Sequence, residues 1–242
     1  MSGLISSAEI VRAYETREDI SKLLTLTNKS MFYQEGECGG NYWKNTELSE
    51  IIIASLVQES IFVYRMIGAV KNRDKFYLVT KMADGECLKN RPDLIINETI
   101  IAQIIFASID LNRLALTHND FCACNIFVKK EKFNMEYKRN DSETYFVPNC
   151  EYLIQIIDFD GTLEQRKPLF DFFRYVTINM EQGTENLTKI IAQELGLDLH
   201  ESDPEEYAPD IYDWCIETAD KMNMLSSESY MPSFMKKFLT HN

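Results

Sequence analysis

Long apolar runs, internal repeats and low-complexity tracts are all missing from this chain of 242 residues. No stretch approaches the roughly 18 apolar residues that a membrane-spanning helix needs. Residues 1–7 carry neither the basic region nor the apolar centre of a secretory signal. We therefore expect neither a membrane anchor nor export by that route.

Positive charge is also scarce. The chain has 25 lysines and arginines against 38 aspartates and glutamates, which gives a net charge of −13. An acidic surface repels the phosphate backbone of nucleic acids, so we expect no direct nucleic-acid binding. The same charge favours a basic partner, such as a peptide rich in lysine and arginine. Because 45% of the residues are hydrophobic, the chain can still bury a substantial core.

The six cysteines include no Cys-x-x-Cys pair. Cys122 and Cys124 form a Cys-x-Cys motif, but no second pair completes a tetrahedral zinc site, so the motif predicts no metal centre. Scattered cysteines are typical of a reducing intracellular compartment, and we expect the thiols to be free. The other four cysteines are at positions 38, 87, 150 and 215.

One short region of the sequence carries several side chains that are suited to catalysis. His118, Asp120 and Asn125 follow the pattern His-x-Asp-x4-Asn, and Asp158 follows the β-like run at 152–157. Phosphoryl transfer from ATP needs such a set, because one carboxylate orients the substrate hydroxyl while an Asn and a second Asp hold Mg²⁺ on the phosphates. Mg²⁺ prefers oxygen ligands, so Asn125 and Asp158 are suitable and the nearby cysteines are not.

The hydrophobic pattern predicts a mixed α+β protein. We expect strands at 75–81, 125–129 and 152–157, an exposed hairpin or loop at 131–150, and helices at 45–57, 98–116, 169–181, 186–196, 209–224 and 231–239. A mixed N-terminal part followed by a mostly helical C-terminal part predicts two lobes. These would be a small β-rich N-lobe with one helix (1–82) and a mainly helical C-lobe (83–242).

The order of these features resembles the eukaryotic protein kinase fold, and within it the haspin-like family. Glu50 opens the sequence Glu-Ile-Ile-Ile-Ala, which is similar to the start of the C helix in the haspin N-lobe. The long insertion between Asn125 and Asp158 is similar to a haspin hairpin. Residues 169–175, Leu-Phe-Asp-Phe-Phe-Arg-Tyr, are similar to the haspin helix that contains Phe-Asp-Ile-Tyr-Arg. The resemblance implies one kinase-like domain over residues 1–242.

The resemblance also implies roles for individual residues, with ATP and Mg²⁺ as cofactors. Asp120 would be the catalytic base, and Asn125 and Asp158 would bind Mg²⁺. His118 would brace the catalytic loop as a structural histidine. Asp171 would anchor that loop from the following helix.

Two departures from the usual kinase pattern concern regulation. Asn119 replaces the Arg that normally pairs with a phosphorylated activation loop, and the short segment after Asp158 has little room for such a loop. This predicts activity without loop phosphorylation. Asp160 replaces the Gly of Asp-Phe-Gly, and because Gly permits large backbone swings, we expect Asp158 to keep one inward position.

Two further departures concern the nucleotide. No Gly-x-Gly-x-x-Gly loop is present, and the glycine cluster at 36–40 carries an acid that would repel phosphate. The lysine that positions ATP and pairs with Glu50 should end the preceding strand. The best strand candidate places Gln34 there, with Lys29 and Lys44 as alternatives. Loss of this charge would remove electrostatic stabilisation of the phosphates.

These features support a haspin-like serine/threonine kinase that transfers the γ-phosphate of ATP to a protein hydroxyl. The family phosphorylates a threonine near the N-terminus of a histone tail, and Glu164 and the acidic run 201–206 are candidates to receive such a basic tail. A second hypothesis is a weak or inactive pseudokinase that acts as a binding or regulatory module. A third, less favoured, is a small-molecule phosphotransferase of the aminoglycoside or choline kinase type. We expect a monomer in the nucleus or cytoplasm, with the nucleus favoured by the resemblance.

Overall fold

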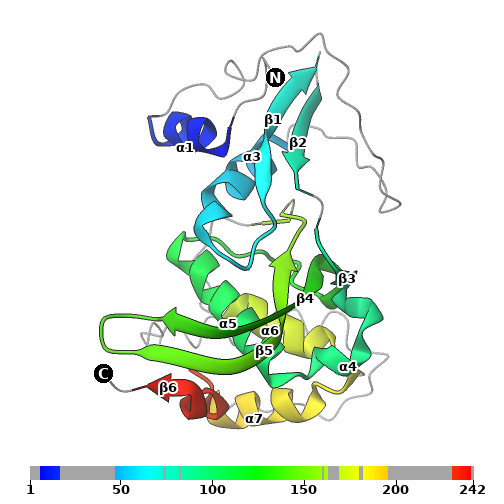
Figure 1. Cartoon of the computed structure of the whole chain (residues 1–242), viewed down its shortest axis with the longest axis vertical. Helices are drawn as coiled ribbons and strands as arrows, with labels where there is room; N and C mark the ends of the chain where they lie inside the picture. The colour runs from blue at the N-terminus through cyan, green and yellow to red at the C-terminus, as the bar shows by residue number, and fades with distance from the viewer. Residues whose placement is uncertain are drawn as a thin grey trace. The chain divides into compact units, whose positions relative to one another are not determined.

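The computed structural model describes residues 6–16, 47–72, 75–81, 83–159, 161–162, 169–179, 182–195 and 231–240. By its contacts the chain divides into two compact units, shown in Figure 1. The first comprises Met1–Ala83 and Asp158–Asp160, and the second comprises Asp84–Ile157 and Gly161–Asn242. Helices and small antiparallel sheets are both present, which confirms the α+β class. That the units are the lobes of a kinase stays a prediction.

The described part of the first unit contains the α-helices α1 (Ser7–Glu15) and α3 (Glu47–Leu56), a 3-10 helix at Val57–Glu59, and an antiparallel sheet of β1 (Met66–Asn72) and β2 (Lys75–Thr80). Helix α1 begins with a capping box. The amide of Ser6 donates to the Glu9 carboxylate at 2.9 Å, and the amide of Glu9 donates back to Ser6 Oγ at 3.4 Å. The first amides of a helix have no backbone acceptor within the helix, and these bonds supply acceptors for two of them. The hydrogen bonds that Ser6 donates also lower the pKa of Glu9.

A small apolar core joins the elements of this unit. It consists of Ile10 from α1, Ile51 and Ala54 from α3, and Met66 and Ala69 from β1. The helix predicted at 45–57 and the strand predicted at 75–81 are confirmed as α3 and β2 with slightly shorter bounds. Helix α1 and strand β1 were not predicted.

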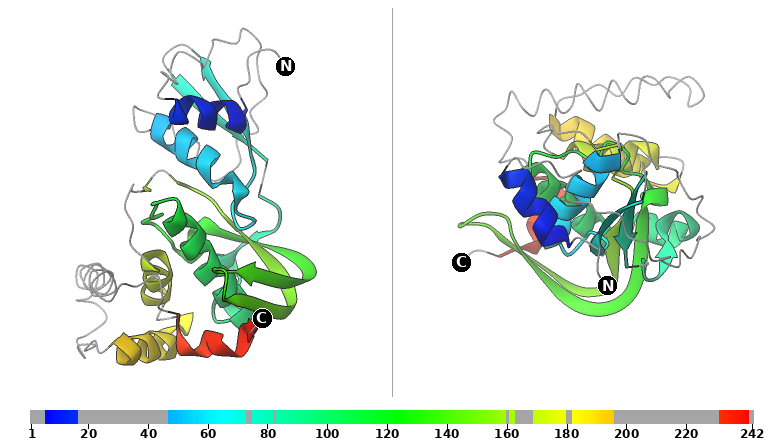
Figure 2. Two further views of the ribbon diagram at one scale, coloured as in Figure 1. Left: turned by 90° about the vertical axis from the view of Figure 1, so that its left-hand side faces the viewer. Right: turned by 90° about the horizontal axis from the view of Figure 1, so that it is seen from above.

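The second unit is built on α5 (Glu98–Arg113) and the long antiparallel hairpin of β4 (Ile126–Lys138) and β5 (Thr144–Ile156). Two short strands extend this sheet: β3 (Glu86–Cys87) pairs with β4, and β6 (Leu239–Thr240) pairs with β5. Figure 2 shows α5 lying along the curved hairpin, against which it packs.

A buried glutamine fixes α5 to β5. The Nε2 atom of Gln103 donates to the Tyr152 carbonyl at 2.8 Å, and its Oε1 atom accepts from the Ile154 amide at 3.0 Å. Gln103 is fully buried, so these bonds satisfy its amide inside the core. These bonds fix the register of β5 against α5. The end of β5 is therefore held beside the loop that follows α5.

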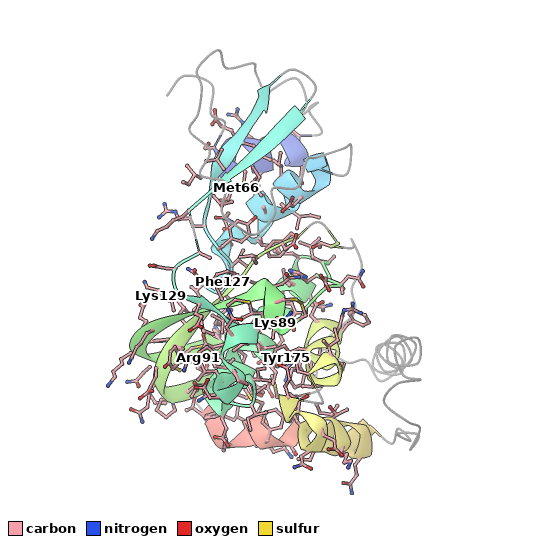
Figure 3. The ribbon with its side chains drawn as sticks, turned by 90° about the vertical axis from the view of Figure 1, so that its right-hand side faces the viewer. Met66, Lys89, Arg91, Phe127, Lys129 and Tyr175 are labelled. Carbon is pink, nitrogen blue, oxygen red and sulfur yellow. A yellow bond between two sulfur atoms is a disulfide. The ribbon has the colours of Figure 1, made fainter. Side chains whose placement is uncertain are left out.

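The described part of this unit also contains the α-helices α4 (Pro92–Ile95), α6 (Phe170–Ile178) and α7 (Glu185–Leu195), and 3-10 helices at Leu88–Asn90, Ala123–Asn125 and Ser233–Phe238. Tyr175 of α6 is buried and donates its hydroxyl to the Ile95 carbonyl at 2.9 Å. Figure 3 shows Tyr175 in the interior of the unit, whereas Arg91 and Lys129 reach its surface. No helix among the described residues combines the length and the apolar character that crossing a membrane requires.

Most other elements of the second unit follow the predictions. The helices predicted at 98–116, 169–181 and 186–196 are confirmed as α5, α6 and α7. The hairpin alternative for 131–150 is confirmed, but its strands extend much further than the predicted strands at 125–129 and 152–157. The helix predicted at 231–239 is wrong in type, because Ser233–Phe238 form a 3-10 helix that leads into β6. The helix predicted at 209–224 lies outside the described residues.

Gly85 lies in the turn before β3 and gives a test of the fold. Its φ is +112°, and a Cβ atom there would lie 2.2 Å from the Val128 carbonyl oxygen. We expect Gly85→Ala to lower the free energy of unfolding by about 2 kcal/mol or more, because strain and backbone overlap add. Gly183→Ala is the matched control: its φ is +105°, but its nearest contact is 3.5 Å from Ile96. Urea unfolding measures both, and equal losses would contradict the close approach at Gly85.

Candidate active site

The candidate loop, residues 117–125, begins where α5 ends. The amide of Leu116 donates to the Leu111 carbonyl and the amide of Ala115 to the Asn112 carbonyl, each at 3.0 Å. Ala115 is left-handed, with φ 58°, so the turn is a Schellman motif with alanine where glycine is usual. The motif ends the helix abruptly and turns the chain into the loop.

Asp171 anchors the start of the loop. It lies in the first turn of α6 and is 3% exposed. Its Oδ2 atom accepts from the His118 amide and its Oδ1 atom from the Asn119 amide, each at 3.0 Å. Burial raises the pKa of Asp171 above its usual range, and the nearby His118 and the two amides oppose this rise. Asp171 thus makes the contacts that the resemblance implies for an anchor.

His118 joins the loop to the residue that precedes Asp158. Its ring is fully buried, its Nε2 atom lies 2.9 Å from the Ile157 carbonyl oxygen, and its Nδ1 atom accepts from the Asp120 amide at 3.4 Å. This pattern assigns the proton to Nε2. The Ile157 amide in turn donates to the Asn125 carbonyl at 3.0 Å. Both ends of the loop are therefore bonded to Ile157, and the contacts of His118 suit a structural brace.

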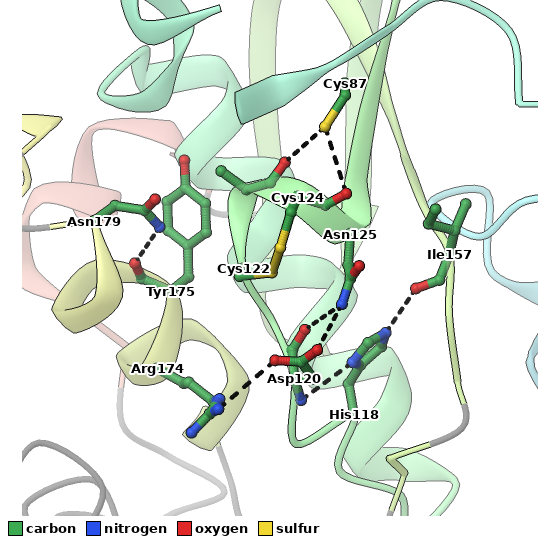
Figure 4. The surroundings of a disulfide bond; sticks show 11 residues. Cys87, His118, Asp120, Cys122, Cys124, Asn125, Ile157, Arg174, Tyr175 and Asn179 are labelled. Carbon is green, nitrogen blue, oxygen red and sulfur yellow. Dashed lines mark hydrogen bonds and ion pairs between the residues drawn. A yellow bond between two sulfur atoms is a disulfide. The ribbon is translucent and has the colours of Figure 1, made fainter. Parts of the chain in front are cut away.

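Asn125 holds the carboxylate of Asp120. Its Nδ2 atom donates to both the carbonyl oxygen and Oδ2 of Asp120, each at 2.9 Å (Figure 4). Asn125 is buried, whereas half of the Asp120 side chain is exposed, at 50%. Among the described residues, both hydrogen bonds of the Asn125 side chain are donated by its nitrogen. Its side-chain oxygen therefore points away from Asp120, and this oxygen is the atom that a hard cation would bind.

Arg174 approaches the other oxygen of the same carboxylate. Its Nη2 atom lies 3.7 Å from Asp120 Oδ1, and its side chain is 21% exposed. Figure 4 shows it reaching Asp120 from α6. No role for Arg174 was predicted from the sequence. The available signal was its position three residues after Asp171, which places both on one face of α6.

Asp158 and Glu50 belong to the first unit. Asp158 is exposed and left-handed, with φ 65°, a strained conformation that clusters at functional sites. The next residue, Phe159, is fully buried and stacks on Tyr64 with ring centroids 6.1 Å apart. Burial raises the pKa of Tyr64, and the charges of Glu50 and Asp158 raise it further. Both predicted carboxylates therefore lie near one buried tyrosine.

The predicted site residues thus fall into three groups. Asp120 and Asn125 are in direct contact within the second unit, and Asp158 and Glu50 share the surroundings of Tyr64 within the first. The candidates for the ATP-positioning side chain, Gln34, Lys29 and Lys44, lie outside the described residues, as do Asp160, Glu164 and 201–206. Within the described ranges no three His, Cys, Asp or Glu side chains gather as a metal-binding group, and the predicted Mg²⁺ pair does not require one.

The prediction of free thiols is wrong for two cysteines. Cys122 and Cys124 form a disulfide, with their Cα atoms 5.3 Å apart. The bend of the loop brings both sulfurs to one side, and this depends on tertiary placement. Cys87 lies beside them, with its sulfur 3.4 Å from the carbonyl oxygens of Ala123 and Cys124. Cys87 and Cys150 are free, and the remaining two cysteines, at 38 and 215, are outside the described residues.

This disulfide predicts the outcome of thiol labelling. Alkylation of the denatured protein without reductant should modify Cys87 and Cys150 and leave Cys122 and Cys124 unmodified. Mass spectrometry of the peptide that contains both should show a mass lower by two hydrogens than the reduced peptide. Prior reduction should make both reactive and serves as the control. Alkylation of Cys122 or Cys124 without reduction would contradict the disulfide.

The chain matches no protein-family model, and a comparison with curated proteins finds no match either. Its chemistry is therefore assigned from the residues around Asp120 and their geometry.

Proposed function

We propose that the chain is an ATP- and Mg²⁺-dependent serine/threonine kinase of the haspin-like type. The observation that supports this most is the carboxylate of Asp120. Asn125 holds one of its oxygens, yet the side chain stays half exposed on a loop anchored by Asp171. A general base needs this combination of fixed orientation and access to the substrate.

Asp120 would act directly on the substrate hydroxyl. It would accept the hydroxyl proton as the hydroxyl oxygen bonds to the terminal phosphorus and the bond from that phosphorus to the bridging oxygen breaks. The anchors at His118 and Asn119 limit movement of the loop, so little reorganisation is needed before this step.

The donor atoms fit the cation that the proposal requires. The side-chain oxygen of Asn125 and the carboxylate of Asp158 would hold Mg²⁺, since both are hard oxygen ligands. When bound, Mg²⁺ would neutralise charge on the phosphates. The side chain of Asp158 is exposed and so is accessible to a cation. Its backbone is left-handed, a strained conformation of the kind found at functional sites.

Charge supports a basic protein substrate, in particular a histone tail. The chain carries a net charge of −13, which would attract a peptide rich in lysine and arginine and raise the rate of encounter. A small amine would gain less from such an extended charge. The protein-directed activity is therefore preferred to the small-molecule alternative.

The proposal is tested by phosphate transfer from labelled ATP with Mg²⁺ to a peptide of the N-terminal tail of histone three. A mixed basic-protein substrate and a panel of aminoglycosides and choline are run in parallel. Transfer to the peptide supports the kinase. Transfer to an amine metabolite alone would replace it with the small-molecule phosphotransferase, and no transfer by well-folded protein would favour the pseudokinase.

A further inference from the structure

Arg174 lies beside the predicted base but takes no part in the proposed function so far. Its Nη2 atom is 3.7 Å from Asp120 Oδ1, which is an ion pair and is too long for a strong hydrogen bond. A guanidinium carries five N–H donors in a planar fork, so it can contact a carboxylate and a second anion at once.

Hydrogen bonds connect the loop of Asp120 to the helix of Arg174. Arg174 comes one helical turn after Asp171, and Asp171 accepts hydrogen bonds from the amides of His118 and Asn119. The same helix thus places both the guanidinium and the loop that carries Asp120. Arg174 is 21% exposed, so solvent screens its charge less than that of a surface arginine.

The position of Arg174 beside Asp120 allows contact with the reacting phosphoryl group. A hydroxyl oriented by Asp120 lies about 3 Å from the carboxylate. The phosphorus that it attacks lies about 3–3.5 Å from the hydroxyl oxygen in a reactive arrangement. A guanidinium 3.7 Å from the same carboxylate can therefore reach a phosphoryl oxygen when the phosphorus lies on its side of Asp120.

The candidate loop itself offers no lysine or arginine for this purpose. Between Asp120 and Asn125 the sequence is Phe-Cys-Ala-Cys, and two of these residues are joined by the disulfide. Within the described part of the chain, Arg174 is the cation that forms an ion pair with Asp120. In a protein with a net charge of −13, a triphosphate needs such a local positive charge.

We propose that Arg174 binds the terminal phosphoryl group of a nucleoside triphosphate. Without nucleotide it pairs with Asp120, and with nucleotide it donates to an oxygen of the transferred group while staying beside the base. The assignment rests on the proposed function, because it takes Asp120 to be the residue that faces the substrate hydroxyl.

The test compares two nucleotides that differ in the terminal phosphoryl group. Calorimetry with Mg²⁺ measures the affinities of ADP and of a non-hydrolysable ATP analogue for the wild type, Arg174→Met and Arg174→Lys. We expect Arg174→Met to weaken the triphosphate analogue by about 10- to 100-fold and ADP by less than about twofold, because one charge-assisted hydrogen bond is lost. Arg174→Lys should keep part of the preference, since it keeps the charge.

Arg91→Met is the matched control. Arg91 also belongs to the second unit, is similarly exposed at 26%, and forms an ion pair with Asp93 at 2.7 Å, but it lies beside Tyr152 and does not contact Asp120. This variant should bind both nucleotides as the wild type does. Thermal unfolding of every variant then separates lost binding from lost folding.

The outcomes distinguish this inference from the proposed function. If Arg174→Met keeps the wild-type preference for the triphosphate, or weakens both nucleotides equally, Arg174 is no phosphoryl ligand and the inference is overturned. If the preference is lost but the wild type transfers no phosphate to any substrate, the inference stands and the kinase proposal fails. If the wild type binds neither nucleotide, both are rejected.

Discussion

Replacing Asp120 with Asn is expected to lower the rate of phosphate transfer by about 10²- to 10⁴-fold, the range that a positioned general base contributes. The amide cannot accept the hydroxyl proton. Its oxygen can still accept the hydrogen bond from Asn125 Nδ2, so the loop should keep its shape. Transfer from labelled ATP to the basic peptide measures the rate, and calorimetry with ADP should show nearly unchanged nucleotide binding.

Asp141→Asn is a suitable control for this experiment. Asp141 is fully exposed in the hairpin turn and pairs with Lys138, at a position with no assigned role in the site. Its variant removes the same charge and should transfer phosphate at the wild-type rate. Wild-type turnover by Asp120→Asn would show that another residue is the base, and the proposed mechanism would have to be abandoned.

Replacing Asp171 with Ala is expected to have the largest effect on stability. It leaves the buried amide of His118 and the partly buried amide of Asn119 without their acceptor, and each such loss costs about 1–3 kcal/mol. The free energy of unfolding should fall by about 2–6 kcal/mol, as measured by urea titration. Hydrogen exchange at the two amides should become faster than in the wild type.

Two variants make this test specific. Asp171→Asn keeps one acceptor oxygen and should lose less stability than Asp171→Ala. Asp141→Ala removes an exposed carboxylate and should change the free energy of unfolding by less than about 0.5 kcal/mol. Unchanged exchange at His118 and Asn119 in Asp171→Ala would contradict the anchor.

The pH dependence has a definite sign. The pKa of Asp171 is raised in the folded protein above its ordinary value of 3.8, so the folded state holds this proton more tightly than the unfolded state. The resulting stabilisation is present below pH 3.8 and is lost as the pH rises through the raised pKa. The stability of the wild type relative to Asp171→Asn should therefore be greatest at low pH and decline as the pH increases.

Elements with a regular apolar pattern could be predicted from the sequence. Helix α5 was found because its apolar side chains recur at helical spacing, and Ile101, Ile104 and Leu111 are indeed buried, whereas Leu114 at its end is exposed. The long hairpin was underestimated because the polar, turn-rich composition of 131–150 was given more weight than its period of two. Met135 and Tyr137 are buried while their neighbours on the strand are exposed, and this alternation is visible in the sequence.

Helix α1 was missed although its start signal is present. Ser6 and Glu9 have the spacing of a capping box, and the structure shows both hydrogen bonds. A short amphipathic helix with few large apolar residues gives only a weak periodic signal, so the capping residues were the better evidence. At Ser233–Phe238 a helix was predicted, but its type was wrong. A short helical pattern does not distinguish an α-helix from the 3-10 helix that forms there.

The site was predictable where its residues lie close together in the sequence. The spacing of Asp120 and Asn125 suggested their shared role, and they are in direct contact. The disulfide between Cys122 and Cys124 and the approach of Arg174 to Asp120 depend on how the loop bends and where α6 is placed. Sequence spacing determines neither the bend of the loop nor the position of α6.

The distance in sequence between the loop and its anchor has a consequence for synthesis of the protein. Asp171 follows His118 by 53 residues, and the whole β4–β5 hairpin lies between them. A growing chain therefore exposes the loop well before α6 leaves the ribosome, and until then the two amides have water as their partner. The hairpin can pair early because its contacts are local. The start of the loop can be fixed by Asp171 only after α6 has emerged, so under the proposed function a nascent chain would carry a folded hairpin before it carries an anchored base.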